Sequence, residues 1–238
     1  MAERGTVTRA LLGIVRTGVD DRRLAELICT ACVDGLDVDG ASVSLLTART
    51  SRLTLWATDP VAEQLEELQF TLNEGACVEA ALSGHPVLVP DLHHRTEVVR
   101  WPLFAAAVAE QTPVRALFAL PLQWGAVNLG VLDLYRTSPG GLSEVQWRDA
   151  LAATDTAALM MLGQRTEPDG DCDGWLDHVI GHRAEVHQAT GMVLVQLGVS
   201  ATDALARLRG YAFVKQRLLI DVARDVVARR LVFTEDMP

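Results

Sequence analysis

The sequence predicts an α+β domain, with a mixed and mainly antiparallel sheet flanked by helices, followed by a small all-α domain of three helices. Strand patterns up to residue 135 mostly come in neighbouring pairs, and they do not alternate regularly with helices, which favours antiparallel pairing. A stretch rich in Gly, Pro and Asp then precedes three helical patterns. We therefore expect a first domain at residues 1–162, an acidic linker at 163–177 and a three-helix domain at 178–233.

The first elements follow from apolar periodicity. Apolar residues recur at helical spacing between Asp20 and Leu36. Residues 41–47 and 52–57 alternate apolar and polar side chains, which predicts a hairpin of half-buried strands with Ser42 and Ser44 on the polar face. Two helices are expected next, over residues 61–68 and 75–82, the second of which stops at Gly84.

Prolines and glycines mark the boundaries of the remaining elements of the first domain. His85-Pro86 blocks helical structure, so residues 87–89 are expected to form a short strand and residues 91–100 a polar loop. Pro102 suits the first turn of a helix that runs to about Glu110. Longer strands are expected at 116–122 and 127–135, and Ser143 is a plausible cap for a helix that runs to Leu162.

The C-terminal part contains three helical patterns, each with one apolar stripe, which predicts a minimal bundle. The expected helices cover residues 178–197, 202–214 and 218–230. The expected core residues are Val186, Ala189, Val193, Leu197, Leu205, Leu208, Ala212, Leu218, Val222 and Val226.

Composition narrows the class of protein. With 49% apolar and 22% charged residues, the chain has the composition of a globular protein. Four cysteines in 238 residues do not indicate a disulfide framework, so we expect a reducing, cytoplasmic location. No apolar stretch approaches the ~18 residues of a membrane span, and Met1–Gly5 lacks the layout of a signal peptide, so no membrane partner is expected.

Charge is distributed unevenly along the chain. Between His178 and Val232 there are eight basic and four acidic residues, which gives this segment a net charge of +4. Because the whole chain has a net charge of −10, the rest of it carries −14. A basic module on an acidic body is typical of a protein in which one part meets a polyanion. The excess is modest, so binding requires dimerisation or base contacts in addition.

Five runs within residues 41–162 form a recognisable pattern: Leu68–Ala80, Gly84–Asp91, Trp101-Pro102, Ala119–Leu122 and Gly130–Asp133. Together they resemble the GAF domain found in regulators of high-GC bacteria. The resemblance implies a sensor with a pocket for a small molecule, and the sequence does not indicate the identity of that molecule or of any cofactor. It places the ligand pocket at Cys77, Phe118 and Asp133.

A second pattern lies within residues 175–233, at Gln188–Met192, Leu197-Gly198, Ala204, Leu208-Arg209, Ala212 and Asp221–Ala223. These residues resemble the ANTAR domain, a three-helix module of bacterial transcription antiterminators. Family members often have a basic residue where Thr190 stands, and a Gly-Arg-Pro type of turn where this chain has Gln216-Arg217-Leu218. Both departures bear on RNA contacts.

This second resemblance implies a dimeric protein that binds RNA hairpins in nascent transcripts and acts in antitermination. Basic side chains fix position by contacting phosphate, and unstacked bases carry sequence information. Tyr211 and Phe213 are candidates either for base stacking or for packing. The expected RNA-binding residues are Thr190, Arg207, Arg209, Lys215, Gln216, Arg217 and Arg224.

Two further alternatives stay open. Val145, Ala152 and Leu159 recur every seven residues, which predicts either a dimer seam or a face that covers the sheet. The rival function is that of a ligand-binding module whose helical domain contacts a protein partner.

No catalytic residues are predicted. The chain has no P-loop, no dinucleotide fingerprint and no G-x-S-x-G motif, and the adjacent Glu66 and Glu67 point largely apart on one helix. Cys29 and Cys32 lie within a helix, where they are expected to be buried apolar residues and not a redox pair.

No metal ligands are predicted either. His85, His93 and His94, with Cys77, are interpreted as loop and packing residues. Residues 169–174 fit the first half of a calcium loop, but Ile180 stands where a bidentate Glu is required, so an acidic connector is the preferred interpretation.

Overall fold

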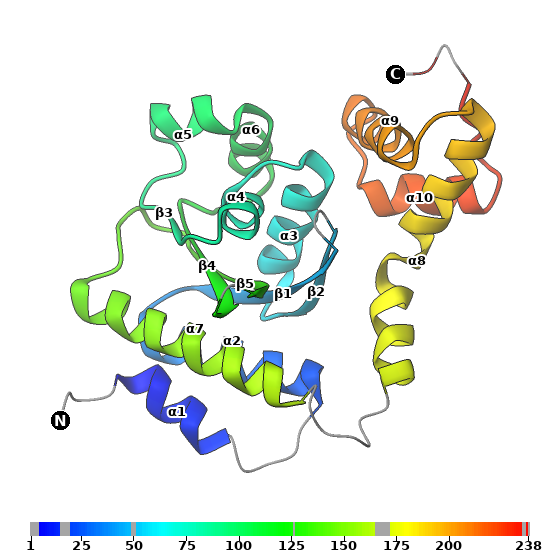
Figure 1. Ribbon diagram of the computed structural model, residues 1–238. Coiled ribbons are helices and arrows are strands. Elements are labelled where there is room, and N and C mark those ends of the chain that lie inside the picture. The colour runs from blue at the N-terminus through cyan, green and yellow to red at the C-terminus, as the bar shows by residue number, and fades with distance from the viewer. Residues whose placement is uncertain are drawn as a thin grey trace. The chain divides into compact units, whose positions relative to one another are not determined.

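The computed structural model describes residues 5–14, 20–48, 51–125, 127–164, 172–234 and 237. The chain divides into two compact units, which we call the first unit (Met1–Gly170) and the second unit (Asp171–Pro238). Each unit is described by itself below, and Figure 1 labels their elements.

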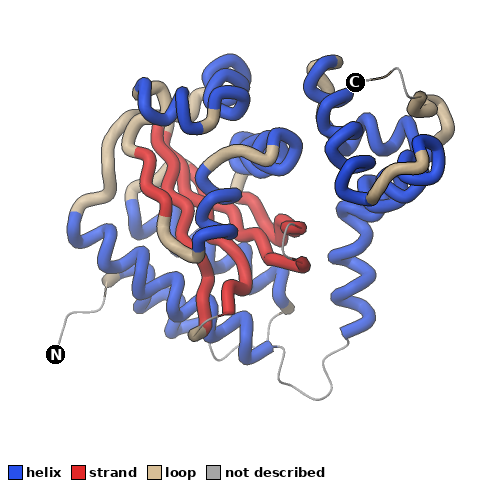
Figure 2. Tube along the Cα trace, turned by 45° about the horizontal axis from the view of Figure 1, so that its top comes forward, coloured by secondary structure: helices blue, strands red, loops and turns tan. Residues whose placement is uncertain are grey.

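The first unit is built on one five-stranded sheet in which every neighbouring pair is antiparallel (Figure 2). The strand order is β2-β1-β5-β4-β3, so the predicted hairpin is confirmed as β1–β2 at one edge. At the centre of the sheet, Gly130 lies so close to β1 that an added Cβ atom would stand 2.2 Å from the carbonyl oxygen of Ser44. The strands are β1 (Gly40–Ala48), β2 (Ser51–Ala57), β3 (Val87–Val89), β4 (Ala116–Trp124) and β5 (Val127–Arg136).

Helices cover both faces of this sheet (Figure 1). One face carries α1 (Thr6–Ile14), α2 (Asp21–Leu36) and α7 (Glu144–Gln164). The opposite face carries α3 (Pro60–Leu72), α4 (Ala76–Ser83), α5 (Arg95–Arg100) and α6 (Pro102–Gln111). The prediction of a sheet flanked by helices is confirmed.

Two local predictions for the first unit are wrong. Ser42 and Ser44, expected on a polar outer face, are only 3% and 1% exposed, because α3 packs over this face of β1 and β2. Residues 91–100, expected as a loop, contain α5, whose six residues bury none of their side chains. A helix without an apolar face carries no periodic signal in the sequence.

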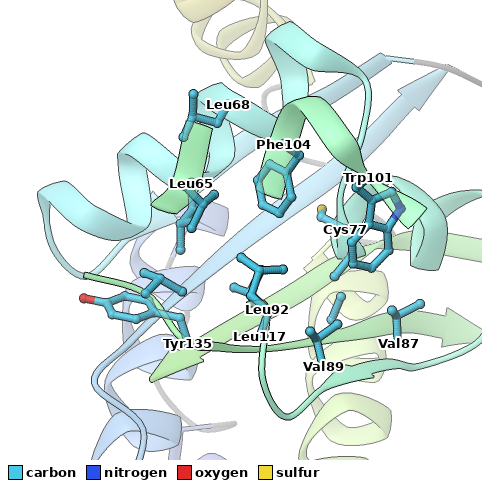
Figure 3. Close-up of a cluster of buried hydrophobic side chains, with 14 of the residues drawn as sticks. Leu65, Leu68, Cys77, Val87, Val89, Leu92, Trp101, Phe104, Leu117 and Tyr135 are labelled. Atoms are coloured by element: carbon cyan, nitrogen blue, oxygen red, sulfur yellow. The ribbon is translucent and has the colours of Figure 1, made fainter. Parts of the chain in front are cut away.

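A hydrophobic core lies between the sheet and the α3–α6 face (Figure 3). Phe104 from α6 and Leu92 from the preceding loop are fully buried there, and Trp101 meets Phe104 edge-on with ring centroids 6.4 Å apart. Leu117 and Tyr135 contribute from the sheet. Because side chains alternate along a strand, residues 118, 120, 132 and 134 point to the other face, toward α2 and α7.

The sequence did not predict helix α1. Its first turn is capped by a buried carboxylate of α7. Asp149 accepts hydrogen bonds from the amides of Val7 (2.9 Å) and Thr8 (3.1 Å) and from the hydroxyl of Thr8 (2.8 Å). These amides belong to the first turn of α1, where backbone donors have no partner within the helix. A carboxylate 142 residues away in the chain thus caps a helix, which local sequence rules do not reveal.

The second unit is a three-helix bundle, as predicted. Its helices are α8 (Cys172–Leu197), α9 (Ala201–Val214) and α10 (Leu219–Val227). Helix α7 ends at Gln164 and α8 begins at Cys172, so helices extend into both ends of the segment expected to be a linker. The predicted core residue Leu218 is 39% exposed because it precedes α10, and Leu219 is buried in its place. The buried residues are Val186, Ala189, Val193, Ala204, Leu208, Ala212, Leu219, Val222, Ala223, Val226 and Phe233.

None of the described helices is, by itself, both long enough and apolar enough to cross a bilayer. The segments Glu185–Leu197 and Ala201–Val214 reach that length and composition only when joined, and they meet at a bend of 104°.

The cap on α1 predicts a stability effect. In Asp149→Ala the first-turn amides of α1 lose a charged acceptor inside the protein, which we expect to lower the free energy of unfolding by about 2–3 kcal/mol. Urea denaturation measures this quantity. The control Asp155→Ala changes an exposed residue of the same helix, for which the expected change is within about 0.5 kcal/mol. Equal effects of the two substitutions would contradict the cap.

Candidate ligand pocket and candidate nucleic-acid interface

A cluster of buried polar side chains lies between the sheet and helices α3 and α4 of the first unit. At its centre is Glu66 of α3, which is 3% exposed. Its carboxylate accepts hydrogen bonds from the hydroxyls of Ser42 (2.7 Å), Ser44 (2.7 Å) and Thr54 (3.2 Å). These three donors on two neighbouring strands hold the buried charge in one orientation, because each satisfies part of its hydrogen-bonding capacity.

Asp133 of β5 faces the same cluster and is held by Gln69. The amide nitrogen of Gln69 donates to Asp133 Oδ2 at 3.0 Å, while its oxygen accepts from the backbone amide of Cys77 at 2.7 Å. One glutamine therefore connects α3, the start of α4 and the sheet. The cysteine Sγ and one carboxylate oxygen each of Glu66 and Asp133 all lie within 4.8 Å of one another.

Arg52 of β2 supplies a positive charge to this cluster. The residue is only 7% exposed, and its side chain interacts with Cys77, Glu66 and Asp133. Its Nη1 atom is buried and has no hydrogen-bond partner among the described residues. A guanidinium donor buried without an acceptor is costly, which marks this atom as a place for a further acceptor.

Burial and charge shift the pKa values of the cluster. Burial, and then the neighbouring Glu66 carboxylate, raise the pKa of Asp133 well above its usual value. Burial likewise raises the pKa of the Cys77 thiol, which the charge of Arg52 opposes in part. Burial lowers the pKa of Arg52, but the attraction of Cys77, Glu66 and Asp133 outweighs it and the net shift is upward. The guanidinium therefore stays charged.

Open space beside the cluster is small. A cavity of about 10 Å³ is lined by Ser42, Gln69 and Asp133 together with apolar side chains of α3 and the sheet. This volume corresponds to roughly one water molecule. A larger organic ligand can enter only if α3 or α4 moves away from the sheet.

The predicted pocket residues fall on two faces of the sheet. Cys77 and Asp133 come together as expected. Phe118 does not join them: strand alternation directs it to the α2–α7 face, where the guanidinium carbon of Arg136 lies 5.8 Å from its ring centroid. That arginine also donates to the carbonyl oxygens of Leu36 and Asp37 at the end of α2. Phe118 therefore does not share a face of the sheet with Cys77 and Asp133.

Arg52, Glu66 and Gln69 belong to the cluster, and our sequence reasoning did not select them. Arg52 and Thr54 alternate with leucines on β2, a pattern that predicts a half-buried strand with these two residues on its polar face. Serine and threonine recur on one face of β1 and β2, and this pattern could have indicated a buried acceptor such as Glu66. Only the packing of α3 shows that this face is covered.

The structure also brings together a different set of possible metal ligands from the one considered in the sequence. His85, His93 and His94 are exposed and do not approach the buried Cys77. The donors that the structure brings together are instead Glu66, Cys77 and Asp133. Of the calcium-loop pattern, residues 169–171 lie outside the described residues, and residues 172–174 belong to helix α8.

In the second unit, the turn between α9 and α10 is exposed throughout. All six residues from Phe213 to Leu218 are exposed, and among them are three of the predicted RNA contacts, Lys215, Gln216 and Arg217. Gln216 adopts a left-handed backbone conformation (φ 50°), which favours glycine. This is where the ANTAR resemblance expected a glycine-containing turn. We call residues 213–218 the α9–α10 turn.

Most predicted arginines of the second unit already have partners within it. Arg217 pairs with Asp225 at 2.7 Å, and Arg224 pairs with Glu185 at 3.3 Å and Asp221 at 3.5 Å. Lys215 forms no ion pair with any residue that the structure describes, and its Nζ lies 5.8 Å from the ring centroid of Tyr211. Lys215 is thus the predicted contact whose charge is most available.

The other predicted contacts lie away from this turn. The hydroxyl of Thr190 donates to the carbonyl of Val186 in its own helix at 2.7 Å. Arg207 donates to the carbonyl oxygen of Met237, and Arg209 is half-buried. Of the two aromatic candidates, Tyr211 packs against Phe233 with ring centroids 5.3 Å apart, whereas Phe213 is 48% exposed. Phe213 therefore remains the candidate for stacking.

The heptad residues of α7 face away from the sheet. Val145 is 73% exposed and Leu159 is 47% exposed, and Ala152 is half-buried. The opposite face of this helix is the buried one, carrying Ala150 and Ala157 among others. The interpretation that the heptad residues cover the sheet is wrong, which leaves the dimer seam as the prediction.

Comparison with known families matches each unit to one domain. A family model described as a GAF domain matches residues 19–161, and one described as an ANTAR domain matches residues 176–227. Among curated proteins no match was found.

Solved structures resemble the first unit. The GAF domain of a phosphoenolpyruvate-protein phosphotransferase from Coxiella burnetii is 14% identical, with a TM-score of 0.52, over 67% of this chain and 92% of that one. The corresponding Acinetobacter domain is 16% identical, also with a TM-score of 0.52, over 69% and 96%. The fRMsr protein of Staphylococcus aureus in its reduced form is 11% identical, with a TM-score of 0.50, over 65% and 92%. At these identities the likeness concerns the fold alone.

Thiol reactivity tests the burial of the cysteines. Burial raises the pKa of Cys32 to about 12, and burial raises the pKa of Cys29 and Cys77 well above the usual thiol value. Because thiolates are the reactive species, we expect none of the three to react with a disulfide reagent at pH 8. The measurement uses Cys172→Ser, which removes the fourth thiol. Three thiols should react after denaturation, and rapid reaction in the folded chain would contradict the buried cluster.

Proposed function

The chain belongs to the GAF domain family and carries an ANTAR domain after the GAF domain, and from this premise we propose that it acts in transcription antitermination by binding RNA hairpins. At the level of the two domains, it is a ligand-sensing regulator. The observation that carries the RNA-binding proposal is the exposed α9–α10 turn within the ANTAR match. It contains the exposed ring of Phe213 and, two residues later, Lys215, which forms no ion pair with a described residue.

The chemistry of this turn suits RNA. Lys215 offers a charge that phosphate can take without breaking an ion pair. Gln216 can donate and accept hydrogen bonds at a base edge, and Phe213 offers a ring on which an unstacked base can lie. Sequence-specific RNA recognition uses such splayed bases in loops.

The paired arginines contribute differently. A phosphate that binds Arg217 must compete with Asp225, and one that binds Arg224 must compete with Glu185 and Asp221. In each case the contact with phosphate replaces an ion pair. The net gain in binding free energy is therefore smaller than for Lys215. We therefore rank Lys215 above Arg217 and Arg224, and we keep Thr190, Arg207 and Arg209 as proposed contacts of lower weight.

The sensor side of the proposal rests on the buried cluster. A ligand there would bind, not be transformed, in a cytoplasmic homodimer whose subunits meet along α7 at Val145, Ala152 and Leu159. Occupancy of the pocket shifts α3 and α4 against the sheet, and the change reaches the RNA-binding bundle through the dimer. A ligand achieves such a switch only by binding one arrangement more tightly than the other.

The second candidate function is binding of a protein partner by the helical domain. The observation that favours it is the exposed apolar set at the same turn, in which Val214 is 56% and Leu218 is 39% exposed. Salt separates the candidates. Phosphate binding weakens steeply as salt increases, while an apolar protein interface does not.

The test of the RNA proposal is a mobility-shift titration with hairpin RNAs from the leader of the chain's own gene, at several salt concentrations. We expect Lys215→Ala to weaken binding and to reduce the slope of log K against log salt by about 1. The matched control is Arg148→Ala, which removes an exposed charge from the first unit. If the folded wild-type chain binds no hairpin, the RNA proposal is wrong and binding of a protein partner is favoured.

The dimer prediction has its own measurement. Leu159→Glu places a charge in the proposed seam, where like charges from two subunits would meet, and we expect it to shift the chain from dimer to monomer at micromolar concentration in sedimentation velocity. Glu110→Ala, at an exposed position of α6 outside the proposed seam, serves as the control. A wild-type chain that sediments as a monomer would overturn the seam.

A further inference from the structure

Two features of the buried cluster point to an occupant in addition to the hydrogen bonds and the Arg52 charge that already stabilise it. One is the meeting of two carboxyl groups and a thiol, within 4.8 Å of one another, in the interior. The other is the Nη1 atom of Arg52, which is buried beside them without an acceptor. Buried ionisable groups are unfavourable unless they are paired, and one further occupant could pair with the three donor groups and with Nη1 of Arg52.

The geometry points to a metal centre: we propose that Glu66, Cys77 and Asp133 bind one divalent transition-metal ion, and that Arg52 donates to a water molecule or small anion in the remaining coordination position. This deepens the proposed sensor function, on which it rests for its role, by naming the chemical class of the ligand.

The donor set favours this class of ion. Thiolate sulfur selects zinc and iron over magnesium and calcium, which prefer sites made entirely of oxygen. Three protein ligands with an open fourth position are typical of zinc sites that bind an exogenous ligand. Ligand atoms around a tetrahedral ion are about 3.5 Å apart, so the three donors need to move by only about 1 Å.

The surroundings have the features of a shell that orients metal ligands. Ser42, Ser44 and Thr54 hydrogen-bond to the carboxylate of Glu66, and Gln69 fixes both Asp133 and the backbone at Cys77. Partners of this kind hold ligating carboxylates in position and often control affinity.

Charge also balances. Two carboxylates and a thiolate carry three negative charges, and a divalent ion with Arg52 supplies three positive ones. When the ion binds, a metal–sulfur bond and two metal–oxygen bonds form, and any proton on the thiol or a carboxyl group passes to solvent. The cavity of about 10 Å³ that Asp133 lines is too small for an organic effector.

The experiment titrates the metal-free full chain with Co²⁺ and then displaces it with Zn²⁺. We expect one equivalent of Co²⁺ to bind and to produce the near-ultraviolet charge-transfer band of a cobalt thiolate. Cys77→Ser should abolish the band, and Glu66→Gln and Asp133→Asn should each weaken binding at least tenfold. Cys32→Ser, which alters a buried thiol outside the cluster, should leave the band and the affinity unchanged.

Other outcomes decide against the inference. A folded wild-type chain, as judged by circular dichroism, that binds no Co²⁺ or Zn²⁺ would overturn it, as would a band that survives in Cys77→Ser. Metal analysis of the chain isolated from cells then distinguishes zinc from iron.

The role in sensing is tested separately, by titrating hairpin RNA with the metal-free and the Zn²⁺-loaded chain. We expect the two affinities to differ at least fivefold. Absence of metal binding with normal RNA binding would refute the metal site and leave the proposed function standing. Metal binding with equal RNA affinities would instead contradict the sensing role of the site.

Discussion

Burial of the Glu66 carboxylate beneath α3 is the constraint on which the arrangement of the first unit depends. A charge in the interior is tolerated only where hydrogen bonds and an opposite charge compensate it. The hydroxyls of Ser42, Ser44 and Thr54 and the guanidinium of Arg52 provide this compensation, and all four come from β1 and β2. The edge hairpin, α3 and the start of α4 are therefore tied together by polar contacts as well as by the apolar core, and the candidate pocket is formed at their junction.

The predictable part of the fold is the part that local periodicity specifies. Strand alternation identified β1 and β2, the sequence also predicted β4 and β5 as longer strands, and helical stripes identified the three helices of the second unit. The element α1 and the buried state of Ser42 and Ser44 depend on contacts between segments far apart in the chain, as with Asp149 and the first turn of α1. No window of sequence contains that information.

The candidate site was predictable to the same limited degree. Family resemblance selected Cys77 and Asp133 because they lie in matching runs, and the structure brings these two residues together. Phe118 is directed to the other face by strand alternation around Ala119. The sequence of the second unit shows eight basic residues but not which of them are available for binding. The structure shows that ion pairs within the bundle engage Arg217 and Arg224, so the excess charge is concentrated at fewer positions than composition implied.

The central claim, that the second unit reads RNA through the α9–α10 turn, is tested most directly by ultraviolet cross-linking of the full chain to a bound hairpin, with the attached peptides identified by mass spectrometry. The account predicts cross-links on the segment from Tyr211 to Arg217, with Phe213 the main attachment point because its ring is exposed. Cross-links confined to the first unit, or to α8 far from this turn, would contradict it.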